Sequence, residues 1–374
     1  MRFSLLAVSV AVATTAAVLS VPAASARPPA GGVTVLPLTA ARRGAVQGAE
    51  LAPRGTGGFA LVGVSWDDPG AAPAATVEVR TRSTATGRWS DWRTLATDEE
   101  DRPDTDSPEG GGGGGSGSGG RGRGATAPLW VGPSDGVAVR AATGGRPLPA
   151  GLRAELVDPG ADPAPAAARA RAGEGPRPGI VTRSGWGADE TLREPDFQYT
   201  GPVRVVFVHH TDTTNDYACA DAPKIIRAIY QYHVKSNGWR DLGYNFLVDK
   251  CGTIYEGRAG GVAQPVLGAH TLGFNTDSAG VAALGTYVSG AVPQAQVDGI
   301  AKLAAWKLGL TGRDAAGTTT LVSASDGSRY RKGTTVTFNA VSGHRDAFNT
   351  ECPGEALYGR LDGIRSWAAH LQGR

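Results

Sequence analysis

The stretch from Gly343 to Gly354 constrains this chain more than any other, because it brings His344 and Cys352 close together in sequence. We expect a strand end at His344 and a loop carrying Cys352. Imidazole nitrogen and thiolate sulfur are both preferred zinc ligands. His209, which ends an apolar run far upstream, provides a third candidate. These three residues predict a zinc site that keeps one open position, because a structural zinc normally has four protein ligands.

The cysteine count supports the assignment of Cys352 as a ligand. The chain has three cysteines, Cys219, Cys251 and Cys352, and all of its histidines also lie beyond residue 200. An odd number of cysteines in an oxidising compartment requires an explanation. We predict a Cys219–Cys251 disulfide, worth about 3–4 kcal/mol in the chain-entropy model. Cys352 then remains as a thiolate ligand.

The first residues predict export. Arg2 is followed by an apolar run from Leu5 to Val21, and Ala24-Ser25-Ala26 provides a small-residue cleavage site. A membrane anchor is the alternative, but the run is short for a span and no later segment approaches ~20 apolar residues. We therefore expect a signal peptide over residues 1–26. The mature protein is expected to be secreted, extracellular or associated with a cell wall, without a membrane anchor.

Length and charge narrow the remaining classes. The 374 residues are enough for two domains. The 37 basic and 35 acidic residues nearly cancel, and no basic block stands out. Nothing in this balance indicates nucleic acid or an anionic membrane surface as a partner.

The first half reads as a small β-rich, sandwich-like domain over residues 27–158, because strand-favouring runs alternate with Gly, Pro and Asp. Within it, residues 99–124 are acidic and then nearly pure Gly and Ser, which predicts a disordered surface loop. An Ala/Pro/Arg-rich linker is expected over residues 159–178. The predicted strands are 33–36, 59–64, 77–80 and 137–140.

Four tryptophans in this half allow two interpretations. They could form a face that stacks on sugars, or they could pack in the core of the domain. We favour core packing for the set, which comprises Trp66, Trp89, Trp92 and Trp130.

The second half, residues 179–374, alternates strands with helices. The apolar run 203–208 is typical of a buried strand, and it ends at His209, where α/β folds place their sites. The alternation predicts an α/β domain with a mixed, largely parallel central sheet and packed helices. Further expected elements are a helix after Asp221, strands at 244–248, 254–256 and 280–284, a helix at 294–310, a polar hairpin at 318–338 and a closing helix at 357–367.

Several motifs in this half occur in the order of a known family. The motifs are Arg183-Ser184-Gly185-Trp186-Gly187-Ala188, Val206-Phe207-Val208-His209-His210-Thr211, Leu242-Gly243-Tyr244-Asn245-Phe246-Leu247-Val248, Ile254-Tyr255-Glu256-Gly257-Arg258, Gly268-Ala269-His270-Thr271-Leu272-Gly273-Phe274-Asn275 and the stretch from His344 to Gly354. Over residues about 180–374, which contain these motifs, the chain resembles the peptidoglycan recognition proteins and zinc N-acetylmuramoyl-L-alanine amidases, a family that includes phage T7 lysozyme.

The resemblance implies roles for individual residues. It implies hydrolysis of the amide between N-acetylmuramic acid and L-alanine of bacterial peptidoglycan, with Zn²⁺ as cofactor and Tyr244 as a phenol beside the metal. The implied zinc ligands are His209, His344 and Cys352. The implied substrate-binding residues are His270, Thr271 and Asn275, with Arg258 and Trp239 as further candidates.

Two positions depart from the family pattern. Phage members carry Lys where this chain has Thr350, and other branches carry Glu where it has Ala282. Proton transfer would then depend on Tyr244, a bound water and Thr350. Tyr244 could instead be a core aromatic residue. His210 should point to the opposite strand face from His209 and be structural.

Three functional hypotheses follow from these residues. We favour a secreted zinc amidase, expected to be monomeric, and keep a non-catalytic muropeptide-recognition module as the alternative. A zinc peptidase is disfavoured, because the chain has no His-Glu-x-x-His helix. Stem-peptide preference and the role of the β-rich domain stay open.

Overall fold

The computed structural model describes residues 31–43, 46–71, 75–97, 101–104, 107, 122–143, 147–161 and 177–374. The predicted signal peptide, residues 1–26, lies outside the described residues. So do residues 162–176 of the predicted linker and most of the Gly-rich stretch. Within the described ranges, no helix is both long and apolar enough to cross a membrane.

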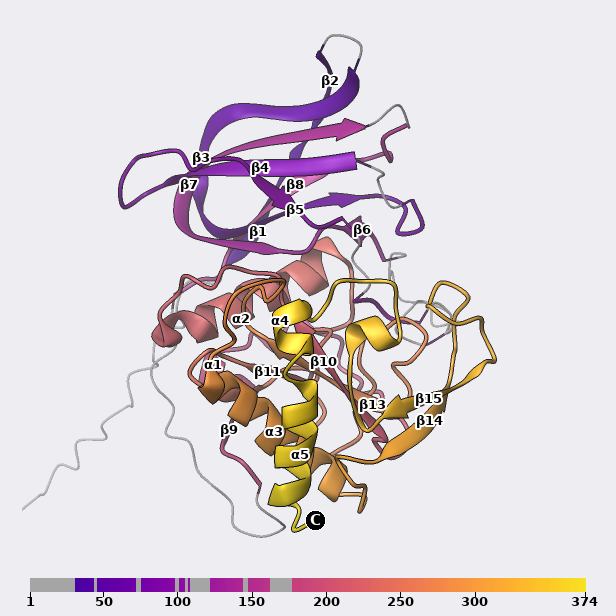
Figure 1. The fold of residues 1–374 in the computed structure, drawn as a ribbon. Helices are drawn as coiled ribbons and strands as arrows, with labels where there is room; N and C mark the ends of the chain where they lie inside the picture. The colour runs from indigo at the N-terminus through magenta and orange to yellow at the C-terminus, as the bar shows by residue number, and fades with distance from the viewer. Residues whose placement is uncertain are drawn as a thin grey trace, which may run out of the picture.

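The described residues of the first half form one eight-stranded antiparallel sheet, with the strand order β1-β8-β3-β7-β4-β5 and with β2 and β6 paired to β3. The long strand β3 carries several register shifts against β7, and Figure 1 shows it curving across the domain. Such bulges bend a strand and increase its twist. The strands are β1 (Gly32–Pro37), β2 (Thr39–Arg43), β3 (Val46–Trp66), β4 (Ala75–Ser83), β5 (Arg93–Leu95), β6 (Gly124–Ala125), β7 (Leu129–Thr143) and β8 (Arg153–Asp158).

The tryptophans of this domain divide into two pairs. Trp66 and Trp130 are buried, as core packing requires. Trp92 is half-buried beneath the guanidinium groups of Arg80 and Arg140, and Arg80 also lies over the half-buried Trp89. The faces of Trp89 and Trp92 are thus engaged by arginines, in the geometry of cation–π contacts.

The second half contains the predicted mixed, largely parallel sheet, in the order β16-β10-β13-β11-β12-β9. Only the β11–β12 pair is antiparallel. The predicted polar hairpin is also present, as the antiparallel pair β14 and β15. The strands are β9 (Ile180–Val181), β10 (Val205–His210), β11 (Phe246–Val248), β12 (Ile254–Glu256), β13 (Ser278–Ala283), β14 (Thr318–Val322), β15 (Thr335–Asn339) and β16 (Val341–Gly343).

Two apolar clusters hold helices against this sheet. One joins α3 (Gln294–Gly309) and α5 (Leu361–Leu371) to side chains of β10, β11 and β13. The other joins α2 (Ala222–Gln231) to α1 (Arg183–Trp186) and to other side chains of the same sheet. Figure 1 shows α3 and α5 side by side in front of the sheet.

Three elements differ in detail from the sequence expectation. The closing helix is divided into α4 (Glu355–Tyr358) and α5, with Gly359 as the C-cap of α4. The helix after Asp221 has Pro223 in its first turn and continues beyond α2 as a π-helical turn, Tyr232–Ser236. Tyr244 precedes strand β11 instead of opening it.

The two halves share an apolar interface. The second cluster includes Leu61, Trp130 and Val157 of the antiparallel sheet together with Ile229 and Tyr232. The Tyr232 hydroxyl donates to the Thr126 carbonyl at 3.0 Å, and Arg227 donates to the Pro159 carbonyl at 3.1 Å. The N-terminal domain therefore packs against α2, and Figure 1 shows its antiparallel sheet above the C-terminal domain.

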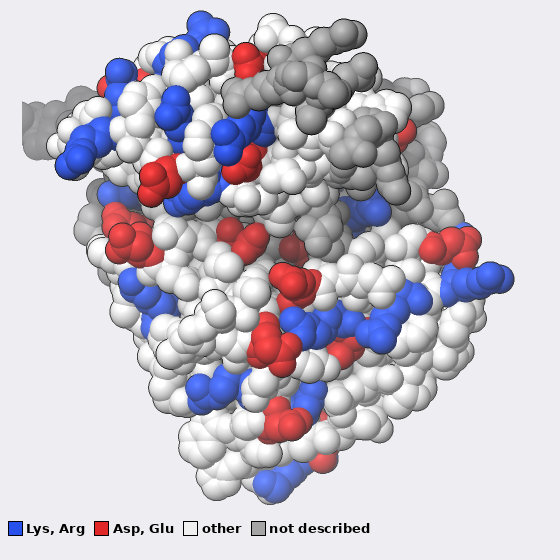
Figure 2. Space-filling view, turned by 45° about the horizontal axis from the view of Figure 1, so that its top comes forward, with Lys and Arg blue, Asp and Glu red and all other residues white. Residues whose placement is uncertain are grey.

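Charge is distributed evenly on the face that combines the two halves. Figure 2 shows acidic and basic side chains interspersed there, without one continuous patch of either sign. This pattern agrees with the near-zero net charge of the sequence.

Candidate metal centre

Parallel strand pairing brings the histidines of the site together. His209 is near the end of β10, and β16 pairs in parallel with β10 and leads directly into the 3-10 turn that begins at His344. Because parallel strands end at the same edge of a sheet, the two imidazoles meet there, with ring centroids 4.5 Å apart.

Cys352 reaches the same point from the following loop. The backbone N–H of Arg345 donates to the Cys352 carbonyl at 3.0 Å, which closes the loop. The Cys352 sulfur lies 3.8 Å from Nδ1 of His209, and the side chain is buried. The candidate donor atoms of His209, His344 and Cys352 all lie within 4.8 Å of one another.

The structure also contains the predicted disulfide. Cys219 and Cys251 are bonded with a sequence separation of 32, so Cys352 is left outside the bridge. Its thiol is therefore available to the centre.

The donor set fits a tetrahedral zinc ion. Both ring nitrogens of His344 are buried without a hydrogen-bond partner among the described residues. Burial lowers the pKa of His344 to about 3, so the ring is neutral and offers a lone pair. Zinc–nitrogen bonds are about 2.05 Å long and zinc–sulfur bonds about 2.3 Å. At tetrahedral angles, two nitrogen donors, or a nitrogen and an oxygen, are then about 3.3 Å apart, and a nitrogen and a sulfur about 3.6 Å apart. The observed 3.8 Å between Nδ1 of His209 and the sulfur is close to this value.

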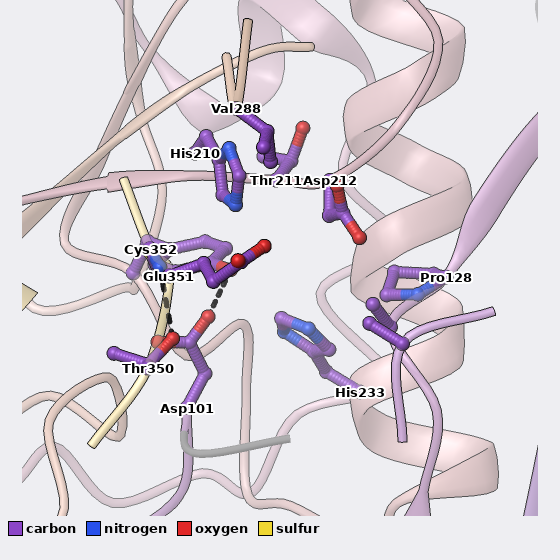
Figure 3. A pocket seen from close by; sticks show the side chains of 13 residues that line it. Asp101, Pro128, His210, Thr211, Asp212, His233, Val288, Thr350, Glu351 and Cys352 are labelled. Carbon is purple, nitrogen blue, oxygen red and sulfur yellow. Dashed lines mark hydrogen bonds between the residues drawn. The ribbon is translucent and has the colours of Figure 1, made fainter. Parts of the chain in front are cut away.

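Asp101, which no sequence pattern singled out, also lies at the candidate metal centre. Asp101, from the N-terminal half, places Oδ1 at 2.9 Å from Nδ1 of His209 and 3.3 Å from Nδ1 of His344. Burial alone would raise the pKa of the Asp101 carboxyl, but the two facing imidazoles and the Tyr244 hydroxyl hold that pKa below its usual range. Figure 3 shows Asp101 entering the pocket that Thr350, Glu351 and Cys352 line.

The position of Asp101 differs from the prediction that residues 99–124 form a disordered surface loop. Residues 101–104 of that stretch are described, and they lie against the candidate centre. The acidic, Gly-rich composition gave no sign of it, because the partners of Asp101 belong to the other domain.

Tyr244 lies beside the centre, as the resemblance implied. Its ring centroid is 5.5 Å from that of His209, and its hydroxyl donates to Oδ2 of Asp101 at 2.6 Å. His233, for which the sequence predicted no role in the site, is a second neighbour. Its Nδ1 accepts the Gly243 N–H at 3.1 Å, and Figure 3 shows its ring facing into the pocket.

His270, Thr271 and Asn275 lie together and are buried. The Asn275 side-chain carbonyl accepts the N–H groups of both His270 and Thr271, at 2.8 and 2.9 Å. The His270 ring packs on Gly280 of β13, where a Cβ would collide with it. The structure thus brings the three predicted residues to one side of the centre, next to residues 101–104.

The two further substrate candidates have structural contacts. The Arg258 guanidinium is buried and donates to the carbonyls of Leu242, Leu267 and Asp241. Trp239 is buried with its ring centroid 4.4 Å from that of His233. Their roles in substrate binding stay predictions.

Thr350 and His210 both border the pocket. The Thr350 hydroxyl accepts the Cys352 N–H at 2.9 Å, so it supports the thiol loop. Nδ1 of His210 accepts the Tyr287 N–H at 3.1 Å, which agrees with a structural role. Burial lowers the pKa of His210 and keeps the ring neutral.

Two family models match separate parts of this chain. Residues 199–355 match the family described as N-acetylmuramoyl-L-alanine amidase, and residues 13–174 match the family described as Rv3811 N-terminal galactose-binding domain-like. The fold and site define an α/β domain with a candidate His/His/Cys metal centre, joined to a galactose-binding-like β domain. The C-terminal domain belongs to the peptidoglycan recognition protein and N-acetylmuramoyl-L-alanine amidase family.

Two similar proteins from animals illustrate the relationship. Human N-acetylmuramoyl-L-alanine amidase is 33% identical over 193 residues, which cover 51% of this chain and 28% of that protein. Peptidoglycan-recognition protein LE of Drosophila melanogaster is 38% identical over 109 residues, 29% of this chain and 30% of its own length. This chain thus matches less than a third of each of these two proteins. Among solved structures, Drosophila PGRP-LB is 28% identical, with 51% of this chain and 94% of that chain covered and a TM-score of 0.39.

Proposed function

We propose that this protein is a secreted, monomeric zinc-dependent N-acetylmuramoyl-L-alanine amidase that acts on bacterial peptidoglycan. The observation that carries the proposal is the buried convergence of His209, His344 and Cys352, whose donor atoms lie within 4.8 Å of one another. A protein that only recognises muropeptides has no need of three metal donors. The family of the C-terminal domain supplies the substrate class.

His209, His344 and Cys352 would hold the zinc ion. When bound, zinc supplies a Lewis acid for the amide carbonyl and lowers the pKa of a coordinated water to about 7. The ligands leave one position of a tetrahedron for water or substrate. The burial of all three side chains excludes bulk water and strengthens electrostatic interactions at the site.

Tyr244 is the chain's hydrogen-bond donor at the reacting carbonyl. Its hydroxyl contacts one oxygen of a carboxylate whose other oxygen lies beside Nδ1 of both histidines. The phenol is therefore within reach of an oxygen at the fourth position. It would donate to that oxygen as negative charge develops.

The reaction adds one water across the amide. The water oxygen bonds to the lactyl carbonyl carbon, the carbon–nitrogen bond breaks, and a proton passes to the leaving nitrogen of L-alanine. Thr350 fixes the Cys352 loop through the Cys352 N–H, so we assign it to positioning of the thiolate.

Digestion of purified peptidoglycan tests the function. Once the fourth metal position is accessible, the zinc-loaded protein should release stem peptides with a new L-alanine amino terminus, whereas Cys352→Ser should release none. New reducing sugar ends would instead indicate a glycosidase. If zinc is bound and muropeptides bind but no amino termini appear over long incubation, the domain is a recognition module.

A further inference from the structure

The carboxylate of Asp101 occupies the position that the proposed reaction requires for water or substrate. Its Oδ1 atom is 2.9 and 3.3 Å from the Nδ1 atoms of His209 and His344, close to the roughly 3.3 Å edge of a zinc tetrahedron. The same oxygen is buried, and the two imidazole nitrogens are its polar neighbours. An anionic oxygen in that state, facing two imidazole nitrogens, has the geometry of a fourth ligand.

These distances also distinguish a ligand from a general base. A base acts on a water that itself takes the fourth position, so it must stand one hydrogen bond further away. Oδ1 of Asp101 is instead at ligand-to-ligand distance from both histidines.

The other groups proposed for catalysis and binding are engaged by the same short segment. Tyr244 donates to Oδ2 of Asp101 at 2.6 Å. The Asn275 amide donates to the Arg102 carbonyl at 3.1 Å and to Asp104 at 3.2 Å, and the Gly273 N–H also donates to Asp104. Residues 101–104 therefore hydrogen-bond both with Tyr244 and with Asn275, which was predicted to bind substrate, and the space between these two residues is called the substrate cleft below.

The space left beside the centre is small. The pocket that Asp101, His233, Tyr244 and Cys352 line has a volume of about 90 Å³. Sites for drug-sized ligands measure roughly 300–1,000 Å³, so this pocket alone is too small to enclose a muramyl peptide. A second pocket of about 560 Å³ adjoins it and shares Val288, Thr350 and Glu351 with it.

The N-terminal domain holds the segment in place. Arg102 donates to the Pro69 carbonyl at 3.0 Å, next to strand β3. The domain itself is anchored through its apolar contact with α2 and the Tyr232–Thr126 hydrogen bond. Residues 101–104 are therefore part of the packed N-terminal domain, and they enter the site of the C-terminal domain.

We propose that the structure shows a latent state, in which Asp101 is the fourth metal ligand and residues 101–104 block the substrate cleft. This proposal rests on the proposed zinc site. Activation then requires that the segment leave the cleft, which frees the fourth position, the Tyr244 hydroxyl and the Asn275 amide together.

The test compares wild-type protein with Asp101→Ala and with the double variant Asp101→Ala/Asp104→Ala, all loaded with Co²⁺ or Zn²⁺. Asp91→Ala is the matched control, because Asp91 is exposed in the same domain. The cobalt forms are titrated with acetohydroxamate, a small metal-binding probe, and followed by their visible spectra. The zinc forms are titrated with a muramyl tripeptide, and cleavage is checked by chromatography of the same samples.

We expect the Asp101→Ala cobalt spectrum to differ from wild type and its hydroxamate affinity to rise at least about tenfold. The double variant should bind the muramyl tripeptide at least about tenfold more tightly than wild type, since a closed cleft lowers apparent affinity by its open fraction. Asp91→Ala should match wild type in every measurement.

The outcomes separate this inference from the proposed activity. Equal spectra and affinities in wild type and variants would overturn latency, even if all forms cleave. Loss of metal in Asp101→Ala would also overturn it, because Asp101 would then be a resident structural ligand. Tighter binding without cleavage in any form would support latency and refute the amidase. If the variants fail to fold, the wild-type cobalt protein still decides, since tight hydroxamate binding at once contradicts a closed fourth position.

Discussion

Nε2 of His209 lies 3.3 Å from the hydroxyl oxygen of Thr271, on the side of the ring opposite the candidate metal position. The same hydroxyl is 2.9 Å from Nδ1 of His270. When Nε2–H of His209 donates to Thr271, the lone pair of its Nδ1 faces Cys352 and Asp101. Thr271 can then donate its own proton to His270. Thr271, which was predicted to bind substrate, thus orients the candidate metal ligand His209.

Thr271→Val should weaken zinc binding about tenfold to a hundredfold, as loss of a hydrogen bond behind a metal-bound histidine usually does. The substitution keeps the shape of the side chain and removes only the hydroxyl. Competition with a chromogenic chelator measures the affinity. Thr94→Val, at an exposed position of β5, is the control. Unchanged zinc affinity in Thr271→Val would show that the hydroxyl does not orient His209.

Tyr244→Phe should lower turnover by roughly 10²–10³, the usual cost of removing one donor to a developing oxyanion. Zinc content should not change, because the phenol is not among the three metal donors. The measurement is the rate of L-alanine amino-terminus release, made in both the wild-type and the Asp101→Ala backgrounds. The second background removes the carboxylate that holds Tyr244 in the closed state. A parallel loss of zinc and activity would assign Tyr244 a structural role instead.

Local sequence patterns were sufficient to predict most of the C-terminal fold. The continuous apolar run before His209 predicted a buried strand, and it forms β10, an interior strand between β16 and β13. The polar hairpin and the helix from Gln294 were predicted for similar reasons. The exact ends of helices and strands were harder to predict. The closing helix is divided at Gly359 because of how α4 and α5 pack, and the spacing of apolar residues does not encode that packing.

The candidate site was predictable where it follows motifs and was missed where it depends on contact between domains. His209, His344 and Cys352 could be identified by residue type and by resemblance, and the structure brings them together. Asp101 lies in an acidic, Gly-rich stretch whose composition predicts disorder. Its role follows only from the packing of the antiparallel sheet on α2. No local pattern carries that information.

Replacement of both disulfide cysteines, Cys219→Ser/Cys251→Ser, should destabilise the C-terminal domain by about 3–4 kcal/mol. The bridge closes a loop with a sequence separation of 32, and its loss restores that loop's entropy to the unfolded chain. We expect a melting temperature lower by about 10 °C for a domain of this size. Zinc content should be unchanged, because Cys352 is outside the bridge. A thiol count on unfolded, metal-free wild-type protein that finds three reactive thiols would refute the pairing.

His233 should make the protein sensitive to acid. Burial lowers the pKa of His233 to about 3. The nearby Asp101 carboxylate acts in the opposite direction but is outweighed, and the Arg258 guanidinium lowers the pKa further. The unfolded chain, with a histidine pKa of about 6.5, therefore binds more protons than the folded protein between these two values. Stability must then fall as the pH is lowered through this window, by about 2 kcal/mol between pH 7.5 and pH 5.

The measurement is the denaturant midpoint at pH 7.5 and pH 5 for wild type, His233→Gln and the control His370→Gln, which changes an exposed histidine of α5. Protonation of the metal ligands contributes equally to all three proteins, so the difference between their pH dependences isolates His233. Wild type and His370→Gln should lose stability in parallel on acidification, whereas His233→Gln should lose about 2 kcal/mol less. Glutamine can still accept the Gly243 N–H, so the loss of that hydrogen bond does not confound the comparison. The same pH dependence in all three proteins would mean that His233 is already accessible to protons, and that its pocket is not sealed from water.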